Sequence, residues 1–252
     1  MATYETGHVK NVANLLNYNQ FITTLGATYN PSMATITLSA LTAMQATAKL
    51  KLDAVTALAD VWKTATNSRE IEFKTLDSFS TQLFGTLKTT NAPQQTIDDF
   101  AFLVNKMRGN SGSAAKKAAA KAAETEQDGA TKFISSSQQS FDQKIEHFSK
   151  MILILQSVPT YAPNETNMQI ASLQAKLANL QKLNTDATKS RADLKAARID
   201  RNIFYYTPNT GMLDTIKKSK NYLLGLYGNT SQQYKVALSF KFVRVIPKSD
   251  SR

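Results

Sequence analysis

The sequence contains no cysteine, no long run of apolar residues and no segment typical of a secretory signal. Without cysteine, disulfide frameworks, thiolate metal sites and cysteine nucleophiles are excluded. The longest wholly apolar run is Met151–Leu155, far short of the roughly 20 residues that cross a bilayer. The first eight residues lack a basic segment followed by an apolar one. We therefore predict a cytoplasmic protein with no membrane partner.

Glycine and proline are also scarce. Only 9 Gly and 6 Pro occur among 252 residues, and 42% of the residues are hydrophobic. Long stretches of Ala, Leu, Lys, Gln and Thr between these few breaks favour helices over a turn-rich β fold. The apolar content is sufficient for a substantial core. The composition therefore predicts an all-α protein.

The chain resembles itself at an offset of 132 positions. Residues 22–71 align with 154–203 without a gap, and 12 of these 50 pairs are identical. Both segments carry apolar residues spaced alternately by three and four, which is the seam of coiled-coil-like helix packing. We therefore predict long helices at about residues 32–66 and 164–198, each beginning after a Tyr-x-Pro step.

Shorter helices are predicted on either side of the long ones. They fall near residues 8–26, 68–90 and 94–107 in the first repeat, and near 134–157, 211–228 and 231–240 in the second. This order indicates a tandem duplication of an antiparallel bundle unit. Residues 239–246 are rich in β-branched and aromatic side chains, so the sequence leaves open whether they form a short strand or a helix.

Three segments of different composition follow from the duplication. We predict a helical repeat at 1–108, a linker rich in Ala, Lys, Gly and Ser at 109–132, and a second helical repeat at 133–252. The net charge of the whole chain is +11, and the second repeat holds +9 of it, against +1 in the first. The second repeat is therefore the basic one.

Four segments resemble a bacterial family of duplicated helical proteins that is common in flavobacteria-like organisms. They are Tyr4–Asn14, Gly26–Pro31, Tyr161–Glu165 and Tyr206–Gly211, and the resemblance covers nearly the whole chain. It implies a soluble bacterial protein. It implies no catalytic or binding residue, because no function is attached to the family.

The basic repeat supplies the candidate nucleic-acid contacts. Lysines recur along its long helix, further lysines cluster near residue 218, and the aromatic run 204–206 follows two arginines. Cationic groups contact phosphates and aromatic rings stack on bases. The candidate contacts are Arg198, Arg201, Lys217, Lys218 and Lys220. Interspersed acidic residues favour a solvated helix surface instead, and the three rings could simply pack under the turn at Thr207–Gly211.

No familiar catalytic pattern occurs. His8 and His147 have no second histidine or carboxylate at the spacing of a helical metal site, so we predict surface or helix-flank histidines and no metal. Phosphate-binding glycine loops and nucleophile elbows are also missing. We predict no catalytic residue, no cofactor and no small-molecule ligand.

Two functions of different class remain. The first is a non-enzymatic structural or protein-interaction module that self-associates through its duplicated helical units into a homo-oligomer. The alternative is a nucleic-acid-associated protein that binds phosphates through its basic second repeat. An enzyme with an unfamiliar site is the least favoured hypothesis.

Overall fold

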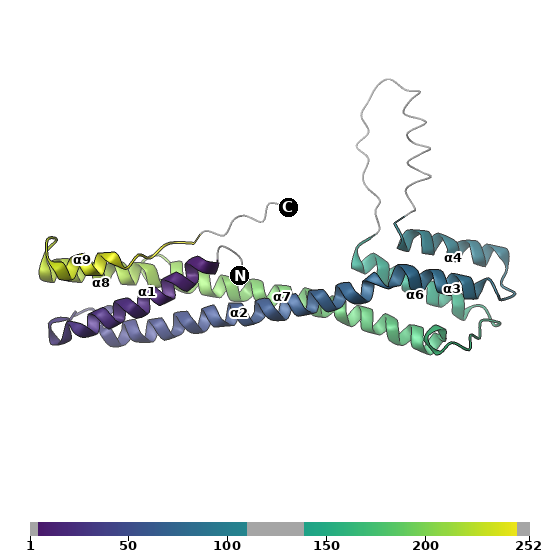
Figure 1. Ribbon diagram of the computed structural model, residues 1–252, viewed down its shortest axis with the longest axis horizontal. Helices are drawn as coiled ribbons and strands as arrows, with labels where there is room; N and C mark the ends of the chain where they lie inside the picture. Colours follow the sequence, from purple (N-terminus) through teal and green to yellow (C-terminus); the bar gives the residue numbers. More distant parts are fainter. Residues whose placement is uncertain (1–4, 110–138, 246–252) are drawn as a thin grey trace, which may run out of the picture. The chain divides into compact units, whose positions relative to one another are not determined.

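The computed structural model describes residues 5–109 and 139–245, which consist almost entirely of helices and their connections (Figure 1). This confirms the predicted all-α class. The predicted linker 109–132 lies outside the described residues except for Gly109. None of the described helices is long and apolar enough to cross a membrane.

The two halves of the chain contain helices in the same order (Figure 1). The first half forms α1 Glu5–Thr24, the 3₁₀ turns η1 Gly26–Thr28 and η2 Ala34–Ile36, α2 Leu38–Lys74, α3 Leu76–Leu87 and α4 Gln94–Met107. The second half forms α6 Phe141–Gln156, η4 Thr166–Met168, α7 Ile170–Tyr206, α8 Met212–Tyr227 and α9 Gln232–Ser239. Helices α2 and α7 have 37 residues each and begin 132 positions apart. The duplication itself remains a prediction, which these matching bounds support.

Both long helices begin and end later than predicted. Each is preceded by a 3₁₀ turn whose last flanking residue is extended, with ψ 155° at Thr37 and 146° at Gln169. These residues interrupt the helix between the Tyr-x-Pro step and the α-helix proper. The apolar spacing underestimated the far ends by about two turns, and α7 ends only before Thr207, where the following Pro208 disfavours helix.

The described residues divide into two compact units that do not coincide with the predicted repeats. Unit 1 comprises residues 1–62 and 191–252, and unit 2 comprises residues 63–190. Unit 1 therefore contains α1, the first part of α2, the last part of α7, α8 and α9. Unit 2 contains the last part of α2, α3, α4, α6 and the first part of α7. Each unit takes helices from both halves of the chain.

Each unit has its own apolar core. The core of unit 1 includes Leu15, Tyr18, Leu41, Tyr205, Ile216 and Leu223. The core of unit 2 includes Phe73, Leu83, Phe100, Phe148, Leu173 and Leu180. Along the long helices the buried positions recur every seven residues, at 41, 48 and 55 in α2 and at 173, 180 and 187 in α7. The seam predicted from the apolar spacing is therefore the buried face of both helices.

The chain after α9 forms no strand within the described residues. Helix α9 ends at Ser239, and residues 240–245 follow without regular secondary structure. A strand needs a second strand to bind its backbone groups, and no such neighbour occurs among residues 5–109 and 139–245. We call residues 240–245 the C-terminal arm.

Candidate functional site

A chain of buried hydroxyl groups occupies the core of unit 1. The Ser219 hydroxyl lies 2.7 Å from Tyr18 OH and 2.6 Å from Tyr29 OH, and Tyr29 OH donates to the carbonyl of Ile36 at 2.6 Å. Each hydroxyl has one proton, so the direction of the chain is fixed. Tyr29 donates to Ile36, Ser219 donates to Tyr29, and Tyr18 donates to Ser219.

This hydroxyl chain is structural rather than reactive. Burial raises the pKa of Tyr18 and of Tyr29, although the hydrogen bond that each shares with Ser219 acts in the opposite direction. Both phenols therefore stay protonated. Ser219 is fully buried, so no substrate reaches its oxygen. In unit 2, Tyr161 OH donates to the carbonyl of Met168 at 3.0 Å, and this pair lies 132 positions after Tyr29 and Ile36.

The C-terminal arm is held in place by polar side chains that bind its backbone. The Asn11 side-chain amide donates to the carbonyl of Val243 at 2.8 Å, and its oxygen accepts the Val243 N–H at 3.0 Å. Asn14, one turn further along α1, donates to the carbonyl of Lys241 at 2.6 Å. The Lys220 ammonium of α8 donates to the carbonyl of Phe240 at 2.6 Å. These three side chains satisfy the backbone groups that a second strand would otherwise bind.

Two aromatic rings of the arm pack on α1. The Phe240 ring centroid is 5.8 Å from that of Tyr18 and 6.0 Å from that of Phe21, and the Phe242 centroid is 6.4 Å from Tyr18. The Lys220 Nζ lies 5.1 Å from the Phe242 centroid. Burial lowers the pKa of Lys220 to about 8, and the nearby charge of Lys241 lowers it further. The rings nevertheless favour the ammonium form by cation–π attraction.

The last described residue of the arm makes a close contact with a glycine. A Cβ atom added to Gly7 would lie 2.6 Å from Cγ2 of Val245, so only glycine permits this approach inside α1. The Val245 N–H donates to Tyr206 OH at 3.2 Å, and the same hydroxyl lies 3.1 Å from Nδ1 of His8. We call the surface formed by α1, α8 and Tyr206 the arm groove.

An open cavity of about 650 Å³ lies beside the end of the arm. It is lined by Ile199, Asn202, Ile203, Tyr206, Thr207, Arg244 and Val245. Ile199 and Ile203 are one helical turn apart on α7, and 60% of each remains exposed. Only Arg244 carries a charge, and its guanidinium lies 5.6 Å from the Tyr206 ring centroid. This Ile203 pocket suits an apolar contact rather than acid–base chemistry.

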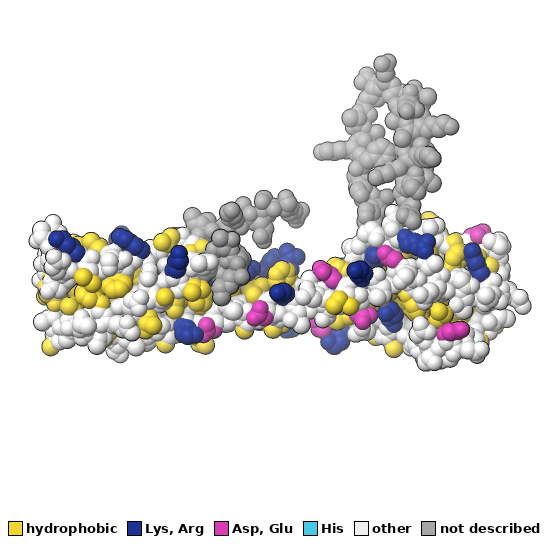
Figure 2. Space-filling model, in the orientation of Figure 1, with side chains coloured by type: hydrophobic (Ala, Val, Ile, Leu, Met, Phe, Trp, Pro, Cys, Tyr) yellow, Lys and Arg dark blue, Asp and Glu magenta, His cyan; other side chains and the backbone are white. Residues whose placement is uncertain are grey.

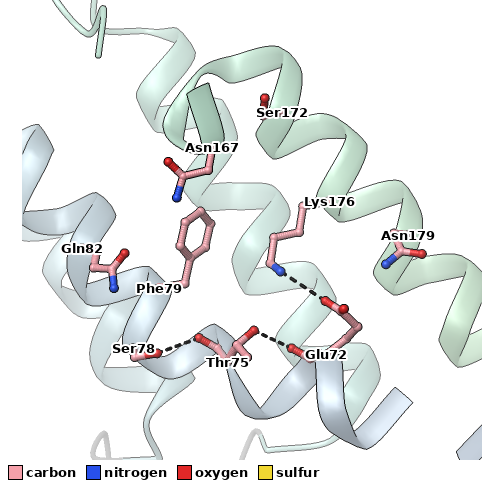
Figure 3. Close-up of a pocket in the computed structure, with 9 residues that line it drawn as sticks. All are labelled: Glu72, Thr75, Ser78, Phe79, Gln82, Asn167, Ser172, Lys176 and Asn179. Carbon is pink, nitrogen blue, oxygen red and sulfur yellow. Dashed lines mark hydrogen bonds and ion pairs between the residues drawn. The ribbon is translucent and has the colours of Figure 1, made fainter. Parts of the chain in front are cut away.

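The cavity in unit 2 is polar and smaller, about 430 Å³ (Figure 3). In the close-up, Lys176 of α7 points toward Glu72 of α2, with 3.3 Å between Nζ and Oε2. The Lys176 Nζ also lies 5.6 Å from the Phe79 ring centroid. Phe204 and Met44 stand at the matching positions of unit 1, where both pack against the apolar core. The ion pair of unit 2 is therefore not repeated.

The candidate nucleic-acid contacts do not form one exposed cluster. Lys217 is exposed on α8. Lys218 donates to the carbonyl of Asn209 at 2.7 Å, and Lys220 binds the arm. Arg198 is half-buried. On the visible face, lysines and arginines are dispersed among hydrophobic and uncharged side chains (Figure 2).

Arg201 is buried, although the sequence predicted it as a nucleic-acid contact. Only 1% of it is exposed, and its guanidinium donates to the side-chain oxygen of Asn202 at 3.1 Å and 3.3 Å. A buried guanidinium cannot reach a phosphate at the surface. Of the aromatic residues that follow, Tyr205 is fully buried and donates to the carbonyl of Ala48 at 2.9 Å, while Phe204 and Tyr206 are partly buried against the core of unit 1. Packing of the three rings under the turn remains a prediction.

Both histidines are buried, with 1% of His8 and 3% of His147 exposed, so neither lies at the surface as one of the two predicted placements had it. His8 packs against Tyr205 with 5.6 Å between ring centroids. Neither ring nitrogen of His147 has a hydrogen-bond partner. Within residues 5–109 and 139–245, no three His, Asp or Glu side chains are placed to hold a metal ion.

The chain matches no protein-family model, and no curated protein or solved structure is significantly similar to it. The resemblance to a flavobacterial family therefore remains a prediction. Conclusions about function rest on the two units themselves.

The sequence analysis missed the arm groove. Its visible signals were two asparagines three residues apart on a predicted helix, Asn11 and Asn14, and the alternating aromatic residues Phe240 and Phe242. The aromatic and β-branched content of residues 239–246 left open a short strand or a helix. Nothing in the sequence indicated that asparagines 230 positions away would bind its backbone.

Proposed function

We propose that the protein is a non-enzymatic interaction module that associates with other copies of itself. The observation that carries this proposal is the Ile203 pocket, in which two exposed isoleucines border an apolar cavity of about 650 Å³. Burying such side chains against a partner removes about 25 cal/mol of unfavourable hydration per Å². An exposed patch beside a cavity is typical of an interaction surface.

A second exposed isoleucine supports association of more than two copies. Ile71 lies in α2 of unit 2, 132 positions before Ile203, and is also largely exposed. If each unit offers an apolar contact at this position, one chain has two attachment points. A protein with two such points can form open linear assemblies or closed rings of several copies.

The test is the mass in solution, measured by light scattering after size exclusion. The wild-type chain should form a species larger than one chain at both about 50 and about 500 mM salt, because salt does not weaken apolar contacts. Ile203→Glu should reduce the mass, and Ile71→Glu/Ile203→Glu should reduce it to that of a single chain, since each substitution places a charge in one of the two contacts. Leu153→Glu is the matched control, because Leu153 is 61% exposed, on α6 of the other unit. A wild-type chain that is monomeric at high concentration would contradict the proposal.

The nucleic-acid alternative rests on the net charge of +9 in the second repeat. Of its five named contacts, Lys217 is the one that we place on an exposed surface without a described hydrogen bond, which weakens the case. Absorbance at 260 nm in the same chromatography tests it. A species rich in nucleic acid that dissociates at about 500 mM salt would favour this alternative.

A further inference from the structure

The arm groove recognises backbone rather than side chains. Asn11 binds the N–H and the carbonyl of one arm residue, as a neighbouring β-strand would. Asn14 and Lys220 each bind a further carbonyl, and Tyr206 accepts the last N–H. The arm side chains contribute the rings of Phe240 and Phe242. Together these contacts form a binding site for an extended peptide with aromatic residues at alternate positions.

The arm is attached to the rest of unit 1 by a short peripheral helix. Helix α9 has 8 residues, of which only Ala237 is buried. At the end of α9, Phe240 turns to an extended backbone with ψ 102°. Lys241, Val243 and Arg244 remain exposed within the groove. Leaving the groove removes the contacts of Phe240 and Phe242 with the core of unit 1, and an arm taken from another copy restores the same contacts.

We propose that the arm groove of one chain binds the C-terminal arm of a second copy, so that copies associate by exchanging arms. This inference rests on the proposed self-association and adds a second contact to the one at the Ile203 pocket. Every contact made by the chain's own arm is available to the arm of another copy, because both have the same sequence. Exchange therefore replaces each contact with an identical one, and rising protein concentration favours it.

The glycine contact provides a direct test in a chain without cysteine. A Cβ atom at position 7 would lie 3.8 Å from Cβ of Val245, which matches the Cβ–Cβ separation of disulfides. The double variant Gly7→Cys/Val245→Cys should form a disulfide between α1 and whichever arm occupies its groove. The substitution at position 245 also removes the Cγ2 atom that a side chain at position 7 would meet.

Isotope mixing distinguishes exchange from binding within one chain. Equal amounts of ¹⁵N-labelled and unlabelled double variant are mixed at high concentration, then diluted, oxidised and digested. Mass spectrometry then measures the peptide pairs that are linked through positions 7 and 245. Exchange predicts that up to about half of these pairs join a labelled peptide to an unlabelled one. Disulfides formed only within single chains would overturn the proposal, and so would failure of the 7–245 link to form in a folded chain.

Two controls complete the design. The double variant Gly225→Cys/Val245→Cys reports chance collisions, because nothing lies within 4 Å of a Cβ at position 225. Mixed-label pairs at this background level would count against exchange. If wild-type chains are oligomeric by light scattering but no mixed-label pairs form, arm exchange fails while the proposed self-association stands. If light scattering shows only single chains and no mixed-label pairs form, both proposals fail.

A peptide experiment avoids the cysteine variants. A fluorescent peptide with the sequence of residues 239–245 should bind the wild-type chain by competing with its own arm. Asn11→Ala should speed dissociation of the bound peptide at least about tenfold, because two hydrogen bonds to the peptide are lost. Asn17→Ala is the matched control, since Asn17 lies on the same helix and is exposed. Equal dissociation rates for the two variants would contradict backbone recognition by Asn11.

Discussion

Ser219→Ala is the substitution whose effect the structure defines most sharply. It removes the middle member of the hydroxyl chain, which accepts from Tyr18 and donates to Tyr29. Tyr18 is fully buried, so water cannot replace the lost acceptor. Tyr29 loses a donor but keeps its own bond to the carbonyl of Ile36. The Tyr18 hydroxyl is therefore the group left without a hydrogen-bond acceptor.

The expected loss of unfolding free energy follows from these contacts. An unsatisfied buried hydroxyl costs about 1–3 kcal/mol, and the second lost hydrogen bond costs about 0.5–1.5 kcal/mol. Alanine also raises the unfolding free energy by about 0.5 kcal/mol, because it favours helix more than serine does. Ser219→Ala should therefore destabilise the protein by about 1–4 kcal/mol, measured by urea unfolding followed by circular dichroism.

Ser80→Ala is the matched control for this substitution. Ser80 is equally buried, but its hydroxyl donates to the carbonyl of Asp77 in the same helix. Its removal loses one hydrogen bond and gains the helix propensity of alanine, so stability should fall by no more than about 1 kcal/mol. Adding Tyr18→Phe to Ser219→Ala should recover part of the loss, because it removes the unsatisfied donor. Equal effects of the two serine substitutions, or strict additivity with Tyr18→Phe, would refute the hydroxyl chain.

Three further predictions follow from single buried or close contacts. Burial, and then the charge of Lys106, lowers the pKa of His147, so the unfolding free energy should fall as pH drops below about 6.5, and His147→Leu should reduce this slope in urea titrations. Gly7→Ala should release the arm through its clash with Val245, which hydrogen exchange would detect as faster exchange of the Val245 amide. Burial lowers the pKa of Lys220 to about 8, so unfolding free energy should rise with pH between about 8 and 10, and Lys220→Met should abolish the rise.

The signs of the two titrations follow from proton uptake. In both cases the unfolded chain binds a proton at a pH where the native chain does not, so stability increases with pH across that interval. For His147 the neighbouring charged groups are Lys106 on α4 and Glu146 and Lys150 on α6, and Glu146 partly opposes the other two. If the unfolding free energy of the wild-type protein did not change with pH below about 6.5, the His147 ring would be accessible to water.

For Gly7→Ala, the comparison is Gly225→Ala. The added methyl group at position 225 meets nothing within 4 Å, so the better helix propensity of alanine should stabilise α8 by up to about 1 kcal/mol. Unchanged amide exchange at Val245 in Gly7→Ala would show that the arm does not lie against α1.

The sequence was sufficient for the order of the helices and for their buried face. Apolar spacing fixed the buried positions because side chains seven residues apart lie on one side of a packed helix. The predicted bounds of α4 at 94–107 were correct. The long helices were misplaced because a 3₁₀ turn and an α-helix start share the same apolar and proline signals, and only the extended Thr37 and Gln169 separate them.

The candidate site was harder to predict, because burial and long-range pairing do not appear in local patterns. Arg201 resembles an exposed cation in the sequence, but the turn of α7 that carries it also carries the fully buried Tyr205. The two histidines were predicted to lie at the surface or on a helix flank because neither has a metal-site partner at helical spacing, and that pattern carries no information about burial. Asn11 and Asn14 acquire their role only once the arm returns to α1.

The helices that make up each unit indicate how the two predicted repeats fold. Unit 1 joins α1 and the start of α2 to the end of α7, α8 and α9, whereas unit 2 joins α6 and the start of α7 to the end of α2, α3 and α4. Under the 132-residue offset these are the same set of elements with the two repeats interchanged. Polar contacts link the repeats inside each unit, as between Tyr205 and Ala48 in unit 1 and between Arg69 and Asn184 in unit 2. Neither repeat therefore completes a core from its own residues, and a repeat separated from its neighbour would have to find a second copy to bury the same apolar face.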